Sequence, residues 1–239
     1  MIGKIKPHLI EIGIFLIVTL LLSIGSHSRN RLWNDEIGLW TDCVKKSPNK
    51  ARPYTNLGLA YFNAGAYDKS KEMAQKAIQI DPKSAYAYYS LVLTFQKLGN
   101  LNEAIAMGKK SLDVDPNLNI VHYSLGAIYF ENGQYEEAAE AFNKFLKVFP
   151  YFPEVHHLLA IVYAAQKKFD KAIAEFEWEL RVNPYHTLSH LNLGQIYWYE
   201  FHNRGKAIYH LRVALMLDPL LPNRGAIQRL VRSLEGFSS

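Results

Sequence analysis

The chain has 239 residues and a net charge of +5 at neutral pH, with a pI near 9.1. Its basic residues are spread over both ends and the turns, without the basic stripe of a nucleic-acid binder, so we expect no nucleic-acid partner. Cys43 is the only cysteine of the sequence, which excludes an internal disulfide.

Residues 1–28 form an apolar amino-terminal segment. Leu9 to Ile24 is almost wholly apolar and follows Lys4 and Lys6. As a helix, this run would be roughly 24 Å long at about 1.5 Å per residue, and a few flanking residues bring it to the length of a membrane span. A cleaved signal peptide is the alternative, because Ser23-Ile24-Gly25 loosely fits a small-residue cleavage site. We favour a retained anchor helix that enters the membrane through residues 9–25.

Residues 29–50 predict a helix of a different kind. Its apolar residues recur at helical spacing and a proline follows, at Pro48, which predicts the end of the helix. We expect this segment to pack as an amino-terminal cap on the helices that follow. The residues that carry the spacing are Leu32, Trp33, Leu39, Trp40, Cys43 and Val44.

A fixed repeat occupies residues 51–221. Successive prolines are 34 residues apart, and the last interval is 35: Pro48, Pro82, Pro116, Pro150, Pro184 and Pro219. Numbering each unit from 31 residues before its proline places leucine at position 7: Leu57, Leu91, Leu125, Leu159 and Leu193. Position 11 is aromatic throughout: Tyr61, Phe95, Tyr129, Tyr163 and Tyr197. Position 20 is small: Ser70, Ala104, Ala138, Ala172 and, after a one-residue insertion, Ala207.

This pattern resembles the tetratricopeptide repeat, a pair of antiparallel helices with a 34-residue period. The resemblance implies an all-α fold, a right-handed superhelix of five full repeats over 51–221. The flanking segments add a capping helix at each end, and the apolar segment adds one transmembrane helix before them. Residues 222–239 hold the carboxy-terminal cap, where Asn223 precedes a helix from Arg224 to Leu234. The three-residue turn Phe201-His202-Asn203 lacks glycine and adds a residue, so we expect a local distortion there.

The resemblance also implies a concave groove lined by positions 2, 5, 9, 12 and 13 of the first helices. Tyrosine and tryptophan often dominate binding energy at interfaces, so aromatic side chains at these positions are candidate partner contacts. The alternative is that several of them contact neighbouring repeats only. Thr55 and Leu59 replace the residues of the family's carboxylate clamp, which argues against a clamp. The candidate groove residues are Arg52, Phe62, Tyr86, Tyr89, Lys97, Tyr123, Phe130, Trp198 and Tyr199.

The sequence holds no phosphate-binding glycine loop, cysteine-pair metal motif or haem motif, so we expect no catalytic, cofactor or metal site. His122, His156 and His190 share position 4 and suggest a metal ladder. Stacked helices lie ~8–10 Å apart, whereas zinc ligands sit ~2.0–2.1 Å from the metal, so we interpret these histidines as structural. Glu175 and Glu177 are interpreted as part of a solvated face.

The junction from Arg29 to Gly58 resembles the seam of polytopic, glycosyltransferase-like membrane proteins that carry tetratricopeptide repeats outside the cytoplasm. The catalytic membrane half of that family is absent, so no activity is implied. We therefore predict a single-pass protein of the inner or plasma membrane, with its repeats on the periplasmic or extracytoplasmic side. It would be a non-enzymatic scaffold whose protein partners are subunits of a membrane-associated complex. The alternative is a non-catalytic subunit of a membrane glycosyltransferase system.

Overall fold

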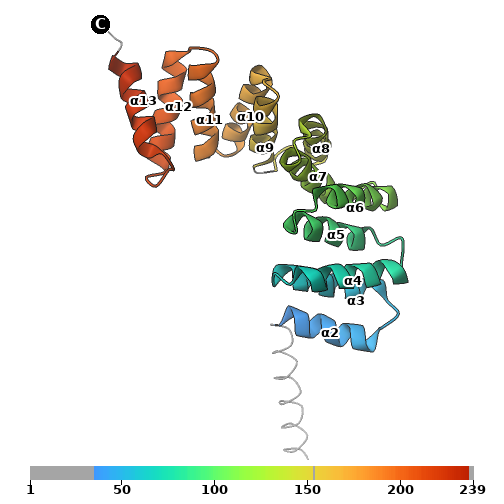
Figure 1. The fold of residues 1–239 in the computed structure, drawn as a ribbon. Helices are drawn as coiled ribbons and strands as arrows, with labels where there is room; N and C mark the ends of the chain where they lie inside the picture. The colour runs from blue at the N-terminus through green and yellow to red at the C-terminus, as the bar shows by residue number, and fades with distance from the viewer. Residues whose placement is uncertain (1–34, 153, 237–239) are drawn as a thin grey trace, which may run out of the picture. The chain divides into compact units, whose positions relative to one another are not determined.

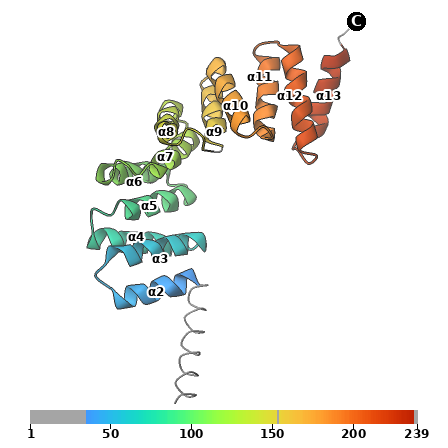
Figure 2. The same ribbon diagram turned by 180° about the vertical axis from the view of Figure 1, so that it is seen from behind.

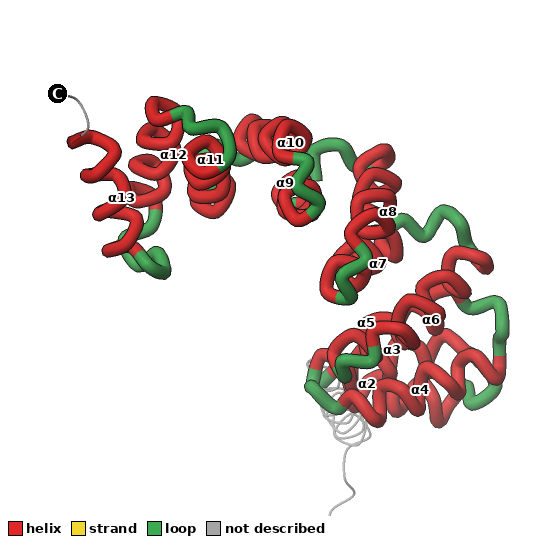
Figure 3. Tube along the Cα trace, turned by 45° about the horizontal axis from the view of Figure 1, so that its top comes forward, coloured by secondary structure: helices red, strands yellow, loops and turns green. Residues whose placement is uncertain are grey.

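The structure is a computed structural model that describes residues 35–152 and 154–236, all of whose regular elements are α-helices (Figure 3). The predicted all-α fold is confirmed over these two ranges. The predicted anchor, residues 1–28, lies outside the described residues, as do the first six residues of the predicted 29–50 cap. None of the helices in the described part of the chain has the length and apolar character of a membrane span.

The chain divides into two compact units between Leu98 and Gly99. The predicted block of five repeats, 51–221, is therefore split between the two helices of its second repeat. Unit 1 ends with α5 and unit 2 begins with α6 (Figure 1).

Unit 1 contains four described helices: α2 (Glu36–Lys46), α3 (Ala51–Asn63), α4 (Tyr67–Ile80) and α5 (Ala85–Lys97). α2 packs on α3, where the amino-terminal cap was predicted, and α3 and α4 form an antiparallel hairpin that α5 extends. A buried polar pair joins α4 to α5. The hydroxyls of Ser70 and Thr94 are 2.8 Å apart, and Thr94 donates to the carbonyl oxygen of Ser90. Both hydroxyls are thus satisfied without water.

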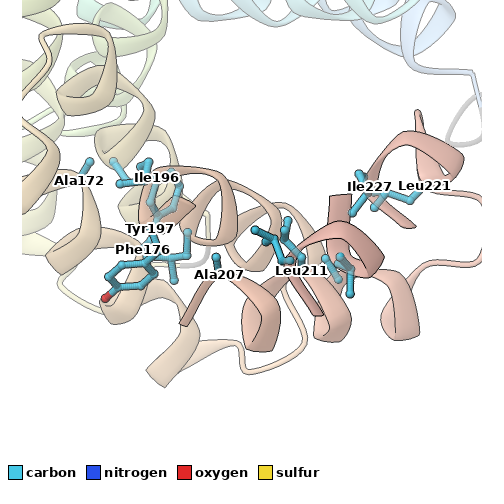
Figure 4. Packing of buried hydrophobic residues seen from close by; sticks show 13 residues of the cluster. Ala172, Phe176, Ile196, Tyr197, Ala207, Leu211, Leu221 and Ile227 are labelled. Carbon is cyan, nitrogen blue, oxygen red and sulfur yellow. The ribbon is translucent and has the colours of Figure 1, made fainter. Parts of the chain in front are cut away.

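Unit 2 contains eight described helices: α6 (Leu101–Val114), α7 (Ile120–Glu131), α8 (Tyr135–Val148), α9 (Val155–Ala165), α10 (Phe169–Val182), α11 (Thr187–Tyr199), α12 (Arg204–Leu217) and α13 (Arg224–Gly236). Each helix packs against the next in the chain. Buried side chains from α9 to α13 meet in one core, which includes Phe176, Leu211 and Ile227 (Figure 4). α13 buries Ile227, Val231 and Leu234, the face predicted for the carboxy-terminal cap.

Small residues set the distance between the two helices of a repeat. Ala138 and Ala172, at the small position 20, are fully buried. A Cβ atom on Gly126 would lie 2.7 Å from the ring of Phe142, and one on Gly194 would lie 2.6 Å from Leu211. Real Cβ atoms do not approach other atoms so closely. The spacing of α7 from α8, and of α11 from α12, is therefore possible only because Gly126 and Gly194, both at position 8, have no side chain.

The turn inside each repeat closes with a left-handed residue. Gly65 and Gly133 have φ values of 75° and 73°, and the next residue donates its N–H to a carbonyl five residues back, the Schellman arrangement. Lys167 takes the same role with φ of 59°. The predicted distortion in the fifth repeat is present: His202 has φ of 50°, and Asn203 donates to Tyr197, six residues back.

The turn between repeats has one construction throughout the described chain. The residue before each repeat proline accepts, through its carbonyl oxygen, an N–H from the residue three positions later, over distances of 3.1–3.4 Å. Proline therefore occupies the second position of a four-residue β-turn, where its fixed φ is favourable. The six turns are 47–50, 81–84, 115–118, 149–152, 183–186 and 218–221.

Candidate functional site

The first candidate site is a pocket of about 460 Å³ in unit 1. α3 supplies one wall, the turn between α4 and α5 supplies another, and Tyr86 of α5 closes the side. Residues at positions 1, 2, 5, 6 and 9 of the first repeat face this pocket, and positions 2, 5 and 9 belong to the set from which the groove was predicted. Its lining residues are Ala51, Arg52, Thr55, Asn56, Leu59, Asp81, Ser84 and Tyr86.

The pocket combines an apolar floor with a few polar groups at its rim. Arg52 is exposed and Tyr86 keeps 57% of its surface, so both are accessible to a partner. Asp81 accepts the N–H of Lys83 at 2.9 Å, which fixes its carboxylate at the turn. The Thr55 hydroxyl donates to the carbonyl oxygen of Ala51 at 3.3 Å and is therefore already engaged. Arg52 is thus the cation of this surface, and Tyr86 is its aromatic contact.

Two of the predicted groove aromatics pack inside their own repeat. Phe62 lies 5.6 Å, centroid to centroid, from Tyr67 of α4, and Phe130 lies 5.6 Å from Tyr135 of α8. Each pair lies beside the turn that joins the two helices of its hairpin. Phe62 and Phe130 thus contact a ring of their own repeat, whereas the alternative to a groove role had such aromatics contact neighbouring repeats.

Tyr89 and Tyr123 hold the same repeat position but belong to different units. Tyr89 is half-buried on α5. Tyr123 contacts three phenylalanine rings of unit 2, with centroid distances of 5.6 Å to Phe145 and 6.2 Å to both Phe142 and Phe152. The Tyr123 ring therefore joins α7 to α8 and to the following turn.

The remaining groove candidates lie at helix ends. Lys97 is exposed in the last turn of α5. Trp198 is half-buried, with its ring 6.4 Å from that of His202, and Tyr199 ends α11 with 60% of its surface exposed. Neither these residues nor Tyr89 line the pocket described above.

Two of the three position-4 histidines, His156 and His190, fasten one repeat to the next. His156 has Nε2 2.9 Å from the carbonyl oxygen of Pro150, and His190 has Nε2 3.2 Å from that of Pro184. Each imidazole thus binds the proline that ends the preceding repeat. In the part of the chain that the structure describes, no three histidine, cysteine or acidic side chains are grouped to hold a metal ion.

The second nitrogen of each imidazole meets a different partner. His156 Nδ1 lies 2.7 Å from a carboxylate oxygen of Glu175. Burial lowers the pKa of His156, but the Glu175 carboxylate and the Pro150 carbonyl outweigh it, and the net shift is upward. His190 faces His210 instead, with Nδ1 atoms 2.9 Å apart. Burial, opposed by the Pro184 carbonyl, lowers the pKa of His190.

The sequence interpretation missed the roles of the acidic residues on α10. Glu175 pairs with His156, and Glu177 accepts the hydroxyl of Tyr197 at 3.1 Å, so the solvated-face interpretation is wrong for both. Glu179 is fully buried and accepts the N–H of Glu154 at 3.4 Å. A 34-residue alignment with α8 would have given a signal, because Ala141 and Phe145 stand where α10 has Glu175 and Glu179.

The helical hairpins, their period and the groove pocket define a helical repeat protein of the kind that binds other proteins. Four family models, each described as tetratricopeptide repeat, match residues 51–84, 73–106, 129–177 and 157–221. The chain therefore carries tetratricopeptide repeats, as its sequence pattern predicted. None of the curated proteins compared with it matches.

Several solved structures share the fold. YrrB, described as a TPR protein with an unusual peptide-binding site, is 21% identical, with a TM-score of 0.70 over 80% of this chain and 97% of its own. PilF of Pseudomonas aeruginosa is 25% identical, with a TM-score of 0.66 over 77% of this chain and 84% of its own. MamA of Desulfovibrio magneticus RS-1 is 18% identical, with a TM-score of 0.66 over 70% and 94%.

Proposed function

We propose that the chain is a non-enzymatic scaffold, anchored to a membrane by residues 9–25, that holds a protein partner through the pocket of unit 1. The observation that carries the binding role is the pocket itself. It lies on the first helix of a repeat, it is large enough for several side chains, and it presents an exposed arginine beside an exposed tyrosine.

The chemistry of the pocket indicates the kind of partner. Leu59 and Ala51 provide apolar floor for a side chain, whereas Arg52 favours an acidic group and Tyr86 can stack or donate a hydrogen bond. We infer that the occupant is an extended segment with an apolar side chain and a nearby carboxylate. The YrrB structure, described as having a peptide-binding site, supports the capacity of this fold for such a ligand.

The anchoring role is supported by sequence alone. Sixteen almost wholly apolar residues, Leu9 to Ile24, stand 26 residues before the first helix of the repeats, Ala51–Asn63. With the anchor in an inner or plasma membrane, the repeats would lie on its periplasmic or extracytoplasmic face. The partner would then be a subunit of a membrane-associated complex.

The test is affinity capture from detergent-solubilised native membranes. We expect Arg52→Glu combined with Tyr86→Ala to lose a protein that the unchanged chain retains. Tyr209→Ala is the matched control, because Tyr209 is 60% exposed on α12 and does not line the pocket. Retention of every captured protein by the double variant would contradict the pocket as the binding site. A polytopic transferase among the captured proteins would favour the glycosyltransferase-subunit alternative.

A further inference from the structure

The exposed apolar residues of unit 2 are concentrated along one edge. Among the residues that the structure describes, unit 2 exposes eleven large apolar side chains, and eight of them lie within four residues of Pro150, Pro184 or Pro219. The eight are Val148, Phe149, Tyr151, Phe152, Tyr185, Leu188, Met216 and Leu220. The turns that hold these prolines, between α8 and α9, α10 and α11, and α12 and α13, lie along the same lower edge in Figures 1 and 2.

The third residue of each inter-repeat turn forms the tip of this edge. Tyr151, Tyr185 and Leu220 directly follow their prolines and are 69%, 76% and 90% exposed. In two of these turns the side chain of the residue before proline accepts a hydrogen bond from the backbone N–H of the tip residue. Asn183 accepts the N–H of Tyr185 at 3.3 Å, and Asp218 accepts that of Leu220 at 2.8 Å. The tip side chain itself is therefore not needed to form the turn.

The same turn in earlier repeats presents a polar tip. Asp81 accepts the N–H of Lys83 at 2.9 Å, and Asp115 accepts that of Asn117 at 3.0 Å. Backbone construction is thus shared, while the side chain at the tip changes from Lys83 and Asn117 to Tyr151, Tyr185 and Leu220. The apolar tips are a property of the last three turns and not of the repeat.

A second exposed position lies three residues before each repeat proline. Along the chain it is Lys45, Gln79, Asp113, Lys147, Arg181 and Met216. The two tyrosine tips thus each have a cation four residues before them, where the turn with the Asn117 tip has an aspartate. Tyrosine beside lysine or arginine is the composition that proteins place at the interface between lipid headgroups and acyl chains.

We propose that this edge of unit 2 rests on a lipid bilayer, with Tyr151, Tyr185 and Leu220 inserted at the headgroup level and Lys147 and Arg181 beside lipid phosphates. The fully buried centre of a protein interface is closely packed and more apolar than its rim. Here the tips lie on three separate turns with the exposed Lys147 and Arg181 near them, and Tyr151 also contacts Trp178, with ring centroids 5.4 Å apart. Side chains distributed in this way suit the headgroup region of a bilayer better than a single packed centre. The inference rests on the proposed membrane anchor, because that segment brings the chain to the bilayer.

The test uses the full chain with Cys43→Ser, reconstituted into vesicles of phosphatidylcholine and phosphatidylglycerol. One new cysteine at a time, Tyr185→Cys or Leu220→Cys, carries an environment-sensitive fluorophore, and the vesicles contain a lipid with a quencher near its headgroup. Asn117→Cys is the matched control on the same kind of turn. We expect a blue shift and loss of fluorescence at 185 and 220, and neither change at 117.

Two outcomes would overturn the proposal, and they differ. A chain that does not float with the vesicles would contradict the anchor and the bilayer contact together. A chain that floats but shows equal quenching at 117, 185 and 220 would contradict the bilayer contact alone and leave a protein partner as the occupant of this edge. In vesicles without the anionic phosphatidylglycerol, we expect quenching at 185 to fall more than at 220. Arg181 lies four residues before position 185, whereas Met216 holds the corresponding place before Leu220.

Discussion

The imidazole rings of His190 and His210 face each other with their Nδ1 atoms 2.9 Å apart. At this distance one nitrogen must donate a hydrogen bond and the other must accept it. An imidazolium ring has no acceptor nitrogen, so at least one of the two rings must be neutral while the contact is kept. Burial, then the neighbouring His190 and Lys206, lower the pKa of His210 to about 4. The contact between α11 and α12 therefore requires neutral histidine.

The buried histidines predict that unit 2 loses stability in acid. Burial, with a smaller effect from His186, lowers the pKa of His157 to about 4. A histidine with a lowered folded-state pKa binds protons more readily when unfolded, so its contribution is full above the unfolded value of about 6.5 and falls as the pH drops towards 4. We expect His157 alone to account for roughly 2–3 kcal/mol over this range. Thermal melts between pH 7.5 and 4.5 measure it.

His157→Gln is the control for that measurement, because an amide can still bond to the hydroxyl of Ser189, which lies 2.9 Å from His157 Nδ1. The variant should lose less stability than the unchanged chain on acidification. An identical pH dependence for the two proteins would contradict the assignment to His157.

The contribution of the His156–Glu175 pair to stability depends on pH in the opposite direction to that of His157. The net rise in the pKa of His156 means that the folded state holds its proton more tightly than the unfolded state. This contribution is full below pH 6.5 and disappears as the pH rises through the folded-state value. We expect Glu175→Gln to cost about 1–2 kcal/mol near pH 5.5 and less near pH 8.5. Glu136→Gln, an exposed change on α8, should cost little at either pH.

Close packing at position 20 predicts a steric effect. Ala138 is fully buried where α8 approaches α7, so Ala138→Leu should destabilise unit 2 by roughly 1–3 kcal/mol through overpacking. Glu140→Leu adds a similar side chain to the exposed face of the same helix and should change the unfolding free energy far less. Chemical denaturation of both variants compares them directly, and equal midpoints would contradict the repeat alignment.

Two of the predicted groove tyrosines, Tyr86 and Tyr123, should behave differently when truncated. Tyr123→Ala removes a ring from a cluster of three phenylalanines and should lower the unfolding free energy by roughly 2 kcal/mol. Tyr86→Ala removes an exposed ring at the unit 1 pocket and should leave the melting temperature nearly unchanged. Calorimetry on the two variants makes the comparison, and a larger loss for Tyr86→Ala would reverse these assignments.

The repeat pattern was sufficient to predict the helices because it records constraints that every repeat shares. Leu159 and Ala172 are buried by their position in the period, and the six prolines mark the six turns. The insertion at 201–203 was also visible, since one extra residue must lengthen a turn. The groove was harder to predict. Position numbering placed Arg52 and Tyr86 at the pocket, but it also included Phe62, Phe130 and Tyr123.

The packing contacts of those three aromatics were not predicted, because their surroundings depend on residues that vary between repeats. Phe130 packs inward because Tyr135 begins the next helix, and Tyr123 does so because Phe145 and Phe152 stand near it. The environment of the acidic side chains on α10 likewise depends on residues that vary between repeats. Glu175 is paired because position 4 of its repeat is His156, a combination that no rule about exposed helix faces contains.

The inter-repeat turn separates the parts of the sequence that make the fold from the part that meets the surroundings. Proline and the residue before it hold the turn through backbone geometry and, in four of the six described turns, a side-chain bond to the tip N–H. The tip side chain can therefore mutate with little consequence for folding. Selection can alter what each turn touches one residue at a time, so a single solenoid can acquire edges of different character along its length.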